Sequence, residues 1–206
     1  MLKIFLLCVS FLTKKIHGIK RRLHEKTIIN NLLKYDVKFN PLKCRFNGNT
    51  FLDLNKGCNI VIGDYFIANS GVTAGIDCGN GCKIAVQSGA KLIIGKYSGM
   101  TNSIIQCHEE IIIGDHVNIG AGCMIMDSNF HSTDWRDRLD RHKDIENHKN
   151  APIRIGDVVF IGARSIICKG VTIGAHSMIA AGSVVVTDVP ANEVWGGNPA
   201  RFIKKI

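Results

Sequence analysis

The chain has 206 residues, of which 46% are hydrophobic and 21% charged, and it carries a formal net charge of +9. This length supports one domain with a substantial core and one appendage, and the apolar content excludes a chain that is disordered throughout. Glycine is abundant, with 21 residues, and aromatic residues make up only 7%, so we expect many tight corners around a core of small aliphatic side chains.

The positive charge is concentrated in the N-terminal segment, residues 1–56. Residues 1–45 hold eleven Lys or Arg and two acidic residues, whereas residues 46–206 hold fifteen of each. A protein that binds nucleic acid would spread this charge over its fold, and no nucleic-acid-binding motif is present, so we expect no nucleic acid partner. Two interpretations of the partly helical stretch 1–26 stay open: a helix held on an anionic membrane surface, or a cap over one end of the main domain.

The eight cysteines form no CxxC pair and no cluster with metal-ligand spacing. We therefore expect no metal site and no disulfide framework, and we interpret the cysteines as small buried hydrophobes in a reducing compartment. This predicts a cytoplasmic protein, peripheral at the inner membrane face if the basic segment binds lipid.

A six-residue period dominates from residue 57 onwards. Its clearest stretch reads IGDVVF, IGARSI, ICKGVT, IGAHSM, IAAGSV and VVTDVP over residues 155–190. A helix needs apolar residues every three or four positions and a half-buried strand every second, so neither explains this period. It is typical of a solenoid in which each hexapeptide is a short strand plus a corner, and three hexapeptides make one triangular turn. Each turn buries its core only against its neighbours, so both ends of the coil need a cap.

This repeat resembles that of the hexapeptide-repeat acyltransferases, and is similar to the galactoside, maltose and surface-polysaccharide O-acetyltransferases. The closing segment VWGGNPARFIKKI, residues 194–206, also resembles the tail of this superfamily. The resemblance implies a mainly β fold over residues 57–206: a left-handed parallel β-helix of about six coils, one long loop at about 131–151 and a short C-terminal helix. It also implies a homotrimer.

The repeat breaks between residues 130 and 152, at a charged stretch that contains Trp135. A loop of this length in a compact domain is usually functional or disordered. In the O-acetyltransferases that the chain resembles, a single histidine at the start of this loop is the general base, and His131 matches that position. A neutral imidazole can take the proton of an acceptor hydroxyl and return it to a leaving thiolate. We expect Asp127 or Asp134 to hold the imidazole tautomer.

The resemblance implies acetyl-CoA as the acyl donor, with no metal. Ala163 and Ala181 match coil positions that contact its pantetheine arm, and Arg201 and Lys204 match basic residues near its phosphates. Where the relatives often carry Thr-Lys, this chain has Val-Thr at residues 186–187, which leaves one phosphate contact without a counterpart at that position.

The acceptor side matches less closely. Asn102 and Glu109 are nearest in type to the sugar-binding residues of the galactoside enzymes, and Trp135 fits a larger acceptor. We expect direct acetyl transfer to a sugar hydroxyl of a surface polysaccharide or its precursor.

Two other functions remain open for this sequence, and a third is disfavoured. The first is an N- or O-acetyltransferase of a nucleotide sugar or an antibiotic, and the second is a non-catalytic β-helix scaffold. A γ-class carbonic anhydrase would need three histidines on a metal, two of them close in sequence, and no other histidine lies within ten residues of His131.

Overall fold

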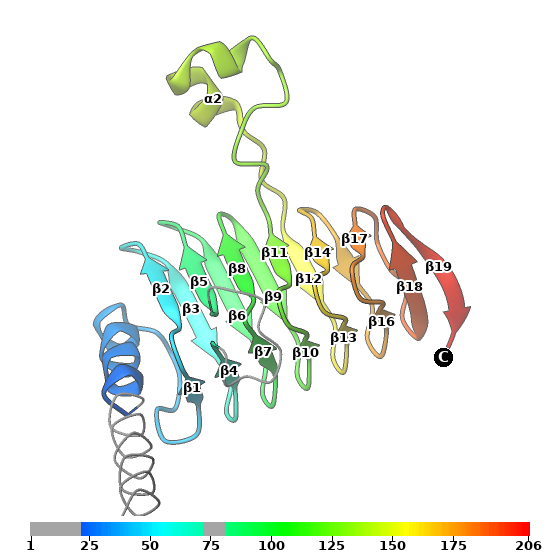
Figure 1. Ribbon diagram of the computed structural model, residues 1–206. Helices are drawn as coiled ribbons and strands as arrows, with labels where there is room; N and C mark the ends of the chain where they lie inside the picture. The colour runs from blue at the N-terminus through cyan, green and yellow to red at the C-terminus, as the bar shows by residue number, and fades with distance from the viewer. Residues whose placement is uncertain (1–21, 72–80) are drawn as a thin grey trace, which may run out of the picture.

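The computed structural model of this protein describes residues 22–71 and 81–206. The chain winds as a coil whose strands fall into three sheets, every third strand joining the same sheet (Figure 1). All strand pairs but the last are parallel, and the six-stranded sheet accounts for the expected six coils.

The strands are short, two to six residues each, because every strand ends at a corner of the coil. The first sheet holds, in spatial order, β1 (Arg45–Asn47), β4 (Ile67–Asn69), β7 (Gly99–Thr101), β10 (Asn118–Ile119), β13 (Phe160–Ile161), β16 (Met178–Ile179), β18 (Glu193–Gly197) and β19 (Ala200–Lys205). The second holds β17 (Val184–Val185), β14 (Ile166–Ile167), β11 (Met124–Met126), β8 (Ile104–Cys107), β5 (Lys83–Val86) and β2 (Phe51–Leu54). The third holds β15 (Thr172–Ile173), β12 (Ile153–Ile155), β9 (Glu110–Ile113), β6 (Lys91–Ile94) and β3 (Asn59–Ile62).

The six-residue period is explained by columns of aliphatic side chains that point into the coil. In one sheet Ile119 pairs in register with Ile161, which pairs in turn with Ile179. Each of these side chains is at most 4% exposed, and burying an isoleucine stabilises the fold by about 1.5–3 kcal/mol. Residues eighteen apart, such as Ile161 and Ile179, therefore lie directly over one another in successive turns, and three such columns form the core.

At one corner of each coil the backbones of successive coils approach closely, and one residue adopts the left-handed backbone conformation. At Gly174 an added Cβ would clash with the backbone of Ala191 one coil further along, which explains why glycine follows the isoleucine there. Two positions after that glycine the chain is left-handed, with φ from 57° to 64°. The residues of this column are Tyr65, Tyr97, His116, Val158 and His176, and Asn192 continues it after Pro190 in place of a glycine.

The boundary expected at residue 57 is wrong, because the coil begins earlier. Strand β1 pairs with β4 from Arg45, and β2 pairs with β5 from Phe51. Before them, residues 22–34 form a helix whose Ile28 and Leu32 are buried in the same core as the coil. Residues 22–34 therefore cap the first coil, while residues 1–21, to which the membrane and cap interpretations also applied, lie outside the described residues.

The short C-terminal helix expected from the resemblance is also wrong. The tail forms strand β19, which turns back antiparallel to β18 and closes the end of the first sheet. Exposed Lys204 and Lys205 lie on this edge strand, and charged side chains there discourage pairing with another chain.

The six cysteines among the described residues are free, and four of them are buried: Cys44, Cys82, Cys107 and Cys123. Burial raises the pKa of the Cys107 thiol, so this side chain is neutral and packs as a small hydrophobe.

Candidate active site

The insertion between β11 and β12, residues 127–152, projects sideways from the middle of the coil (Figure 1). Its base is a narrow two-stranded neck in which Asn129 N donates to Lys149 O at 3.0 Å and Ala151 N donates to Asp127 O at 2.9 Å. The strands on either side keep the register of the coil: β11 pairs with β8 and β14, and β12 pairs with β9 and β15. The expected interruption is therefore an ordered excursion that leaves the stacking intact.

The outer end of the insertion contains a 3₁₀ helix, η2 (Asp137–Leu139), and a short helix, α2 (Arg141–Asn147). Asp140 is the N-cap of α2, and its carboxylate accepts hydrogen bonds from the backbone N–H groups of His142 and Lys143. This cap satisfies donors that the first helical turn leaves free. It fixes the start of α2 and thereby the position of Asp144 on it.

His131 and Asp144 form the central pair of the candidate site. The imidazole Nδ1 lies 2.6 Å from Oδ2 of Asp144, and Oδ1 of the same carboxylate accepts a hydrogen bond from Ser132 N at 2.8 Å. The hydrogen bond with His131 is the main reason that the pKa of the Asp144 carboxyl lies below its usual value. A carboxylate at Nδ1 favours the tautomer with the proton on Nδ1, which leaves Nε2 as the basic nitrogen.

The expectation that Asp127 or Asp134 holds the imidazole is wrong. Asp127 is fully buried, and its two oxygens accept hydrogen bonds from the backbone N–H groups of His108 and Glu109 at 2.7 and 2.8 Å. Asp134 instead pairs with Arg136. Asp127 therefore ties the neck to the neighbouring coil, and the carboxylate partner of His131 comes from α2.

A group of aromatic rings packs where the neck meets the coil. The His108 ring contacts Phe130 edge to face, with centroids 5.1 Å apart, and lies 6.0 Å from the His148 ring. Burial lowers the pKa of His108, with His148 adding to the effect and Asp127 opposing it. The three rings therefore pack together where the insertion leaves the coil.

Of the three residues expected to bind the acceptor, one is buried in a coil corner and two are exposed. Asn102 is 5% exposed, and its side chain forms hydrogen bonds with both backbone groups of Gly71, at 2.7 and 3.3 Å, so it has a structural role in a coil corner. Glu109 is exposed beside the neck. Trp135 is exposed on the insertion, with the Arg136 guanidinium 5.1 Å from the centre of its ring.

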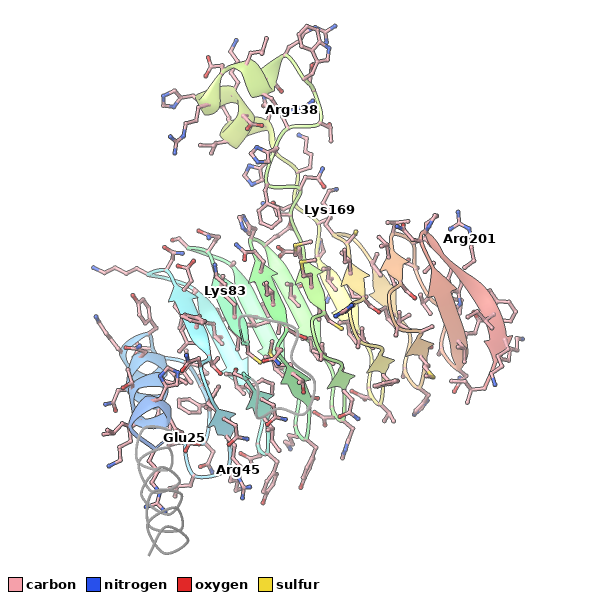
Figure 2. The ribbon with its side chains drawn as sticks, viewed as in Figure 1. Glu25, Arg45, Lys83, Arg138, Lys169 and Arg201 are labelled. Carbon is pink, nitrogen blue, oxygen red and sulfur yellow. The ribbon has the colours of Figure 1, made fainter. Side chains whose placement is uncertain are left out.

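The residues expected to contact the acyl donor lie in the C-terminal coils. Ala163 and Ala181 occupy equivalent positions in successive coils, because Gly182 N donates to Ala163 O at 2.8 Å. Arg201 and Lys204 are exposed on β19, and Figure 2 shows Arg201 at the C-terminal end of the coil. The alanines therefore form one column, and the two cations lie beyond it on the edge strand; their roles stay predictions.

A hollow of about 380 Å³, not expected from the sequence, lies on the outer face of the first sheet. The rings of Tyr65, Tyr97 and His116 stack along its neighbouring corner with centroids 4.8 Å apart. Aromatic residues two positions after glycine in IGDYF, IGKYS and IGDHV were the available signal. Other residues that line the hollow are Asn69, Thr101, Asn118 and Phe160.

No group of three or more His, Cys, Asp or Glu side chains within residues 22–71 and 81–206 is arranged to hold a metal ion. The chemistry that the described geometry offers is proton transfer by an imidazole whose other nitrogen is held by a carboxylate.

Comparisons with known families and curated proteins agree with the repeat. The family model "Bacterial transferase hexapeptide (six repeats)" matches residues 152–187, and "Hexapeptide repeat of succinyl-transferase" matches residues 110–126. The galactoside O-acetyltransferase of Escherichia coli is 51% identical over 55 residues, 27% of each chain. The 2,3,4,5-tetrahydropyridine-2,6-dicarboxylate N-acetyltransferase of Clostridium perfringens is 50% identical over 62 residues, 30% of this chain and 26% of that one. The matches thus span about a quarter of these relatives' lengths.

Solved structures show the same architecture over most of the chain. A hexapeptide-repeat-containing acetyltransferase from Vibrio cholerae is 28% identical with a TM-score of 0.51, covering 76% of this chain and 71% of that one. A maltose O-acetyltransferase from Clostridium difficile is 27% identical with a TM-score of 0.51, covering 80% and 67%. The polysialic-acid-specific acetyltransferase NeuO, 22% identical with a TM-score of 0.59, covers 79% and 71% and shares the fold. The repeat, the coil and these likenesses agree: the chain is similar to the hexapeptide-repeat transferases and shares their left-handed β-helix fold.

Proposed function

We propose that this protein transfers an acetyl group from acetyl-CoA directly to a sugar hydroxyl, with His131 as the general base. The observation that carries the proposal is the His131–Asp144 pair at the insertion, a base with its second nitrogen already held. Two similar proteins support the acceptor class, since they are named galactoside and maltose O-acetyltransferases. A surface polysaccharide or its precursor is the acceptor that best fits a projecting insertion with an exposed tryptophan.

The reaction needs one proton moved twice. Nε2 of His131 takes the hydroxyl proton as the sugar oxygen attacks the thioester carbonyl, and Asp144 stabilises the imidazolium that forms. When the tetrahedral intermediate collapses, the carbon–sulfur bond breaks and the imidazolium returns the proton to the thiolate. The products are the acetyl ester and free CoA, and the histidine is regenerated.

The exposure of His131 supports a site shared between copies of the chain. Its side chain is 69% exposed, whereas proton transfer from an alcohol to the imidazole is favoured where water is excluded. We propose that a neighbouring copy covers it in a homotrimer, with the donor along Ala163 and Ala181 and its phosphates near Arg201 and Lys204. Equilibrium sedimentation that finds only monomer at working concentration would contradict this part.

A thiol-release assay with acetyl-CoA and a panel of sugar acceptors, with product masses measured, tests the function. His131→Ala should abolish most of the transfer, and His142→Ala is the matched control because its side chain is exposed on α2 while its backbone N–H makes the capping bond. Equal rates for both variants would remove His131 from the reaction.

Amine acceptors belong in the same panel because one similar protein is a named N-acetyltransferase, 50% identical over 62 residues. Transfer to amines alone would replace the sugar proposal, with nucleotide-linked amino sugars and aminated antibiotics as the next substrates to test. Absence of acetyl-CoA binding by calorimetry would favour a non-catalytic scaffold.

A further inference from the structure

The N-terminal helix, residues 22–34, has an inner face that seals the coil. Ile28 and Leu32 are at most 2% exposed and belong to the core that also contains Phe46 and Phe66. The helix lies against the β1 and β2 end of the coil, so its opposite side is the end of the molecule (Figure 1). The capping role therefore uses one face, and the other face is exposed among the residues that the structure describes.

That outer face combines leucines with cations. At 3.6 residues per turn, Leu23, Lys26, Asn30, Leu33 and Lys34 point away from Ile28 and Leu32, and we call these five residues the end surface. All five are exposed, and the two leucines are 59% and 52% exposed. An isolated exposed leucine is ordinary, but two of them among lysines on one helix face form an amphipathic pattern that the fold itself does not use.

No carboxylate neutralises the end surface within its own helix. Glu25 is the acidic residue of this helix, and its Oε1 accepts a hydrogen bond from Phe46 N at 3.4 Å, so it turns toward strand β1. Figure 2 shows Glu25 and Arg45 at the same end of the molecule. Residues 22–45 hold six Lys or Arg and two acidic residues, whereas residues 46–206 have no net charge, so the excess cations of the described residues lie in this part of the chain.

We propose that the end surface docks on an anionic lipid membrane. The lysines would pair with lipid phosphates while Leu23 and Leu33 enter the boundary between headgroups and acyl chains. A phosphodiester backbone has no apolar layer in which to bury leucines, which favours lipid over nucleic acid. No helix within the described residues is long and apolar enough to cross a bilayer. The coil would then stand on the membrane with the insertion held to its side.

Vesicle co-sedimentation of the full chain tests this surface without using acetyl transfer, so its result is independent of the proposed function. The probes are vesicles of phosphatidylcholine alone and of phosphatidylcholine mixed with phosphatidylglycerol. We expect binding to the anionic vesicles only, and weaker binding as salt is raised.

The double variant Lys26→Glu, Lys34→Glu should bind anionic vesicles roughly 30-fold or more weakly, because each cation near such a surface contributes about a factor of five. Lys96→Glu with Lys205→Glu is the matched control, since it changes net charge equally at exposed sites elsewhere. A control that loses as much binding as the test variant would overturn the proposal, as would absence of binding by the unaltered chain.

Leu23→Ser with Leu33→Ser separates insertion from simple charge attraction. We expect this variant to lose affinity for anionic vesicles although its charge is unchanged, because each apolar side chain contributes burial. Leu139→Ser with Ile206→Ser, exposed at 79% and 69%, is its control. Unchanged binding by the Leu23, Leu33 variant, or equal binding of the unaltered chain to an RNA homopolymer and to the vesicles, would refute docking on lipid.

Discussion

The substitution Asp127→Asn tests whether this carboxylate stabilises the fold or orients His131 in the reaction. Its two oxygens accept one backbone N–H each, from His108 at 2.7 Å and from Glu109 at 2.8 Å, and the residue is fully buried. Asparagine has one oxygen to accept a single bond. Its amide nitrogen would face the second N–H, donor against donor, at a fully buried position.

The size of the effect follows from those contacts. A hydrogen bond to a charged acceptor contributes about 1.5–3 kcal/mol, and an unsatisfied buried donor costs a similar amount. We therefore expect Asp127→Asn to lower the free energy of unfolding by about 2–3 kcal/mol, which for a chain of this size lowers Tm by roughly 4–12 °C.

Scanning calorimetry of Asp127→Asn beside Asp134→Asn provides the measurement. Asp134 is half exposed and pairs only with Arg136 in its own turn, so its loss should change stability by at most about 0.5 kcal/mol. Equal Tm values for the two variants would refute the structural role of Asp127. A normal Tm for Asp127→Asn with a displaced pH–rate profile would instead restore Asp127 as a partner of His131.

Three further predictions follow from the same geometry. His131→Ala should lower kcat by about 10²- to 10⁴-fold, and Asp144→Asn should lower it less at nearly constant KM; a change confined to KM would contradict the roles given to both. Burial lowers the pKa of His108, so as pH falls below the ordinary value of 6.5 the unfolded chain takes up a proton before the folded one, and Tm should decrease there. His108→Phe should reduce this dependence of Tm on pH. Parallel plots of Tm against pH for the variant and the unaltered chain would contradict the explanation. Ile161→Ala should lower the free energy of unfolding measured in urea by about 2–5 kcal/mol, and a loss below that of Phe160→Ser on the same strand would argue against a closely packed column.

The sequence was sufficient to predict the coil because its signal is geometric. Isoleucine every sixth residue has one structural explanation, and the charged stretch after Phe130 can only leave such a coil at a corner. The first coil was missed because Phe46, Leu52 and Leu54 take the place of the isoleucine–glycine pattern, although the alternation in FLDL was a strand signal.

The partner of His131 could not be predicted, since it depends on tertiary contact. Asp144 lies thirteen residues away in a stretch without a repeat, and it reaches the ring only because Asp140 starts α2 where it does. The helix start is readable as an N-cap, whereas the direction in which the helix folds back is not. The prediction of a C-terminal helix also failed because of a tertiary contact. The basic tail becomes strand β19 because β18 presents a free edge for pairing.

Met124 lies opposite Ile104 and Ile166, and Ile153 lies opposite Ile111, although residues 127–152 separate the two strands in the chain. The strand pairing on either side thus does not depend on the sequence inserted between β11 and β12. A chimera that carries another protein's insertion between β11 and β12 should fold without substitutions in the neighbouring strands. Acceptor preference could therefore diverge among related proteins while the coil stays unchanged.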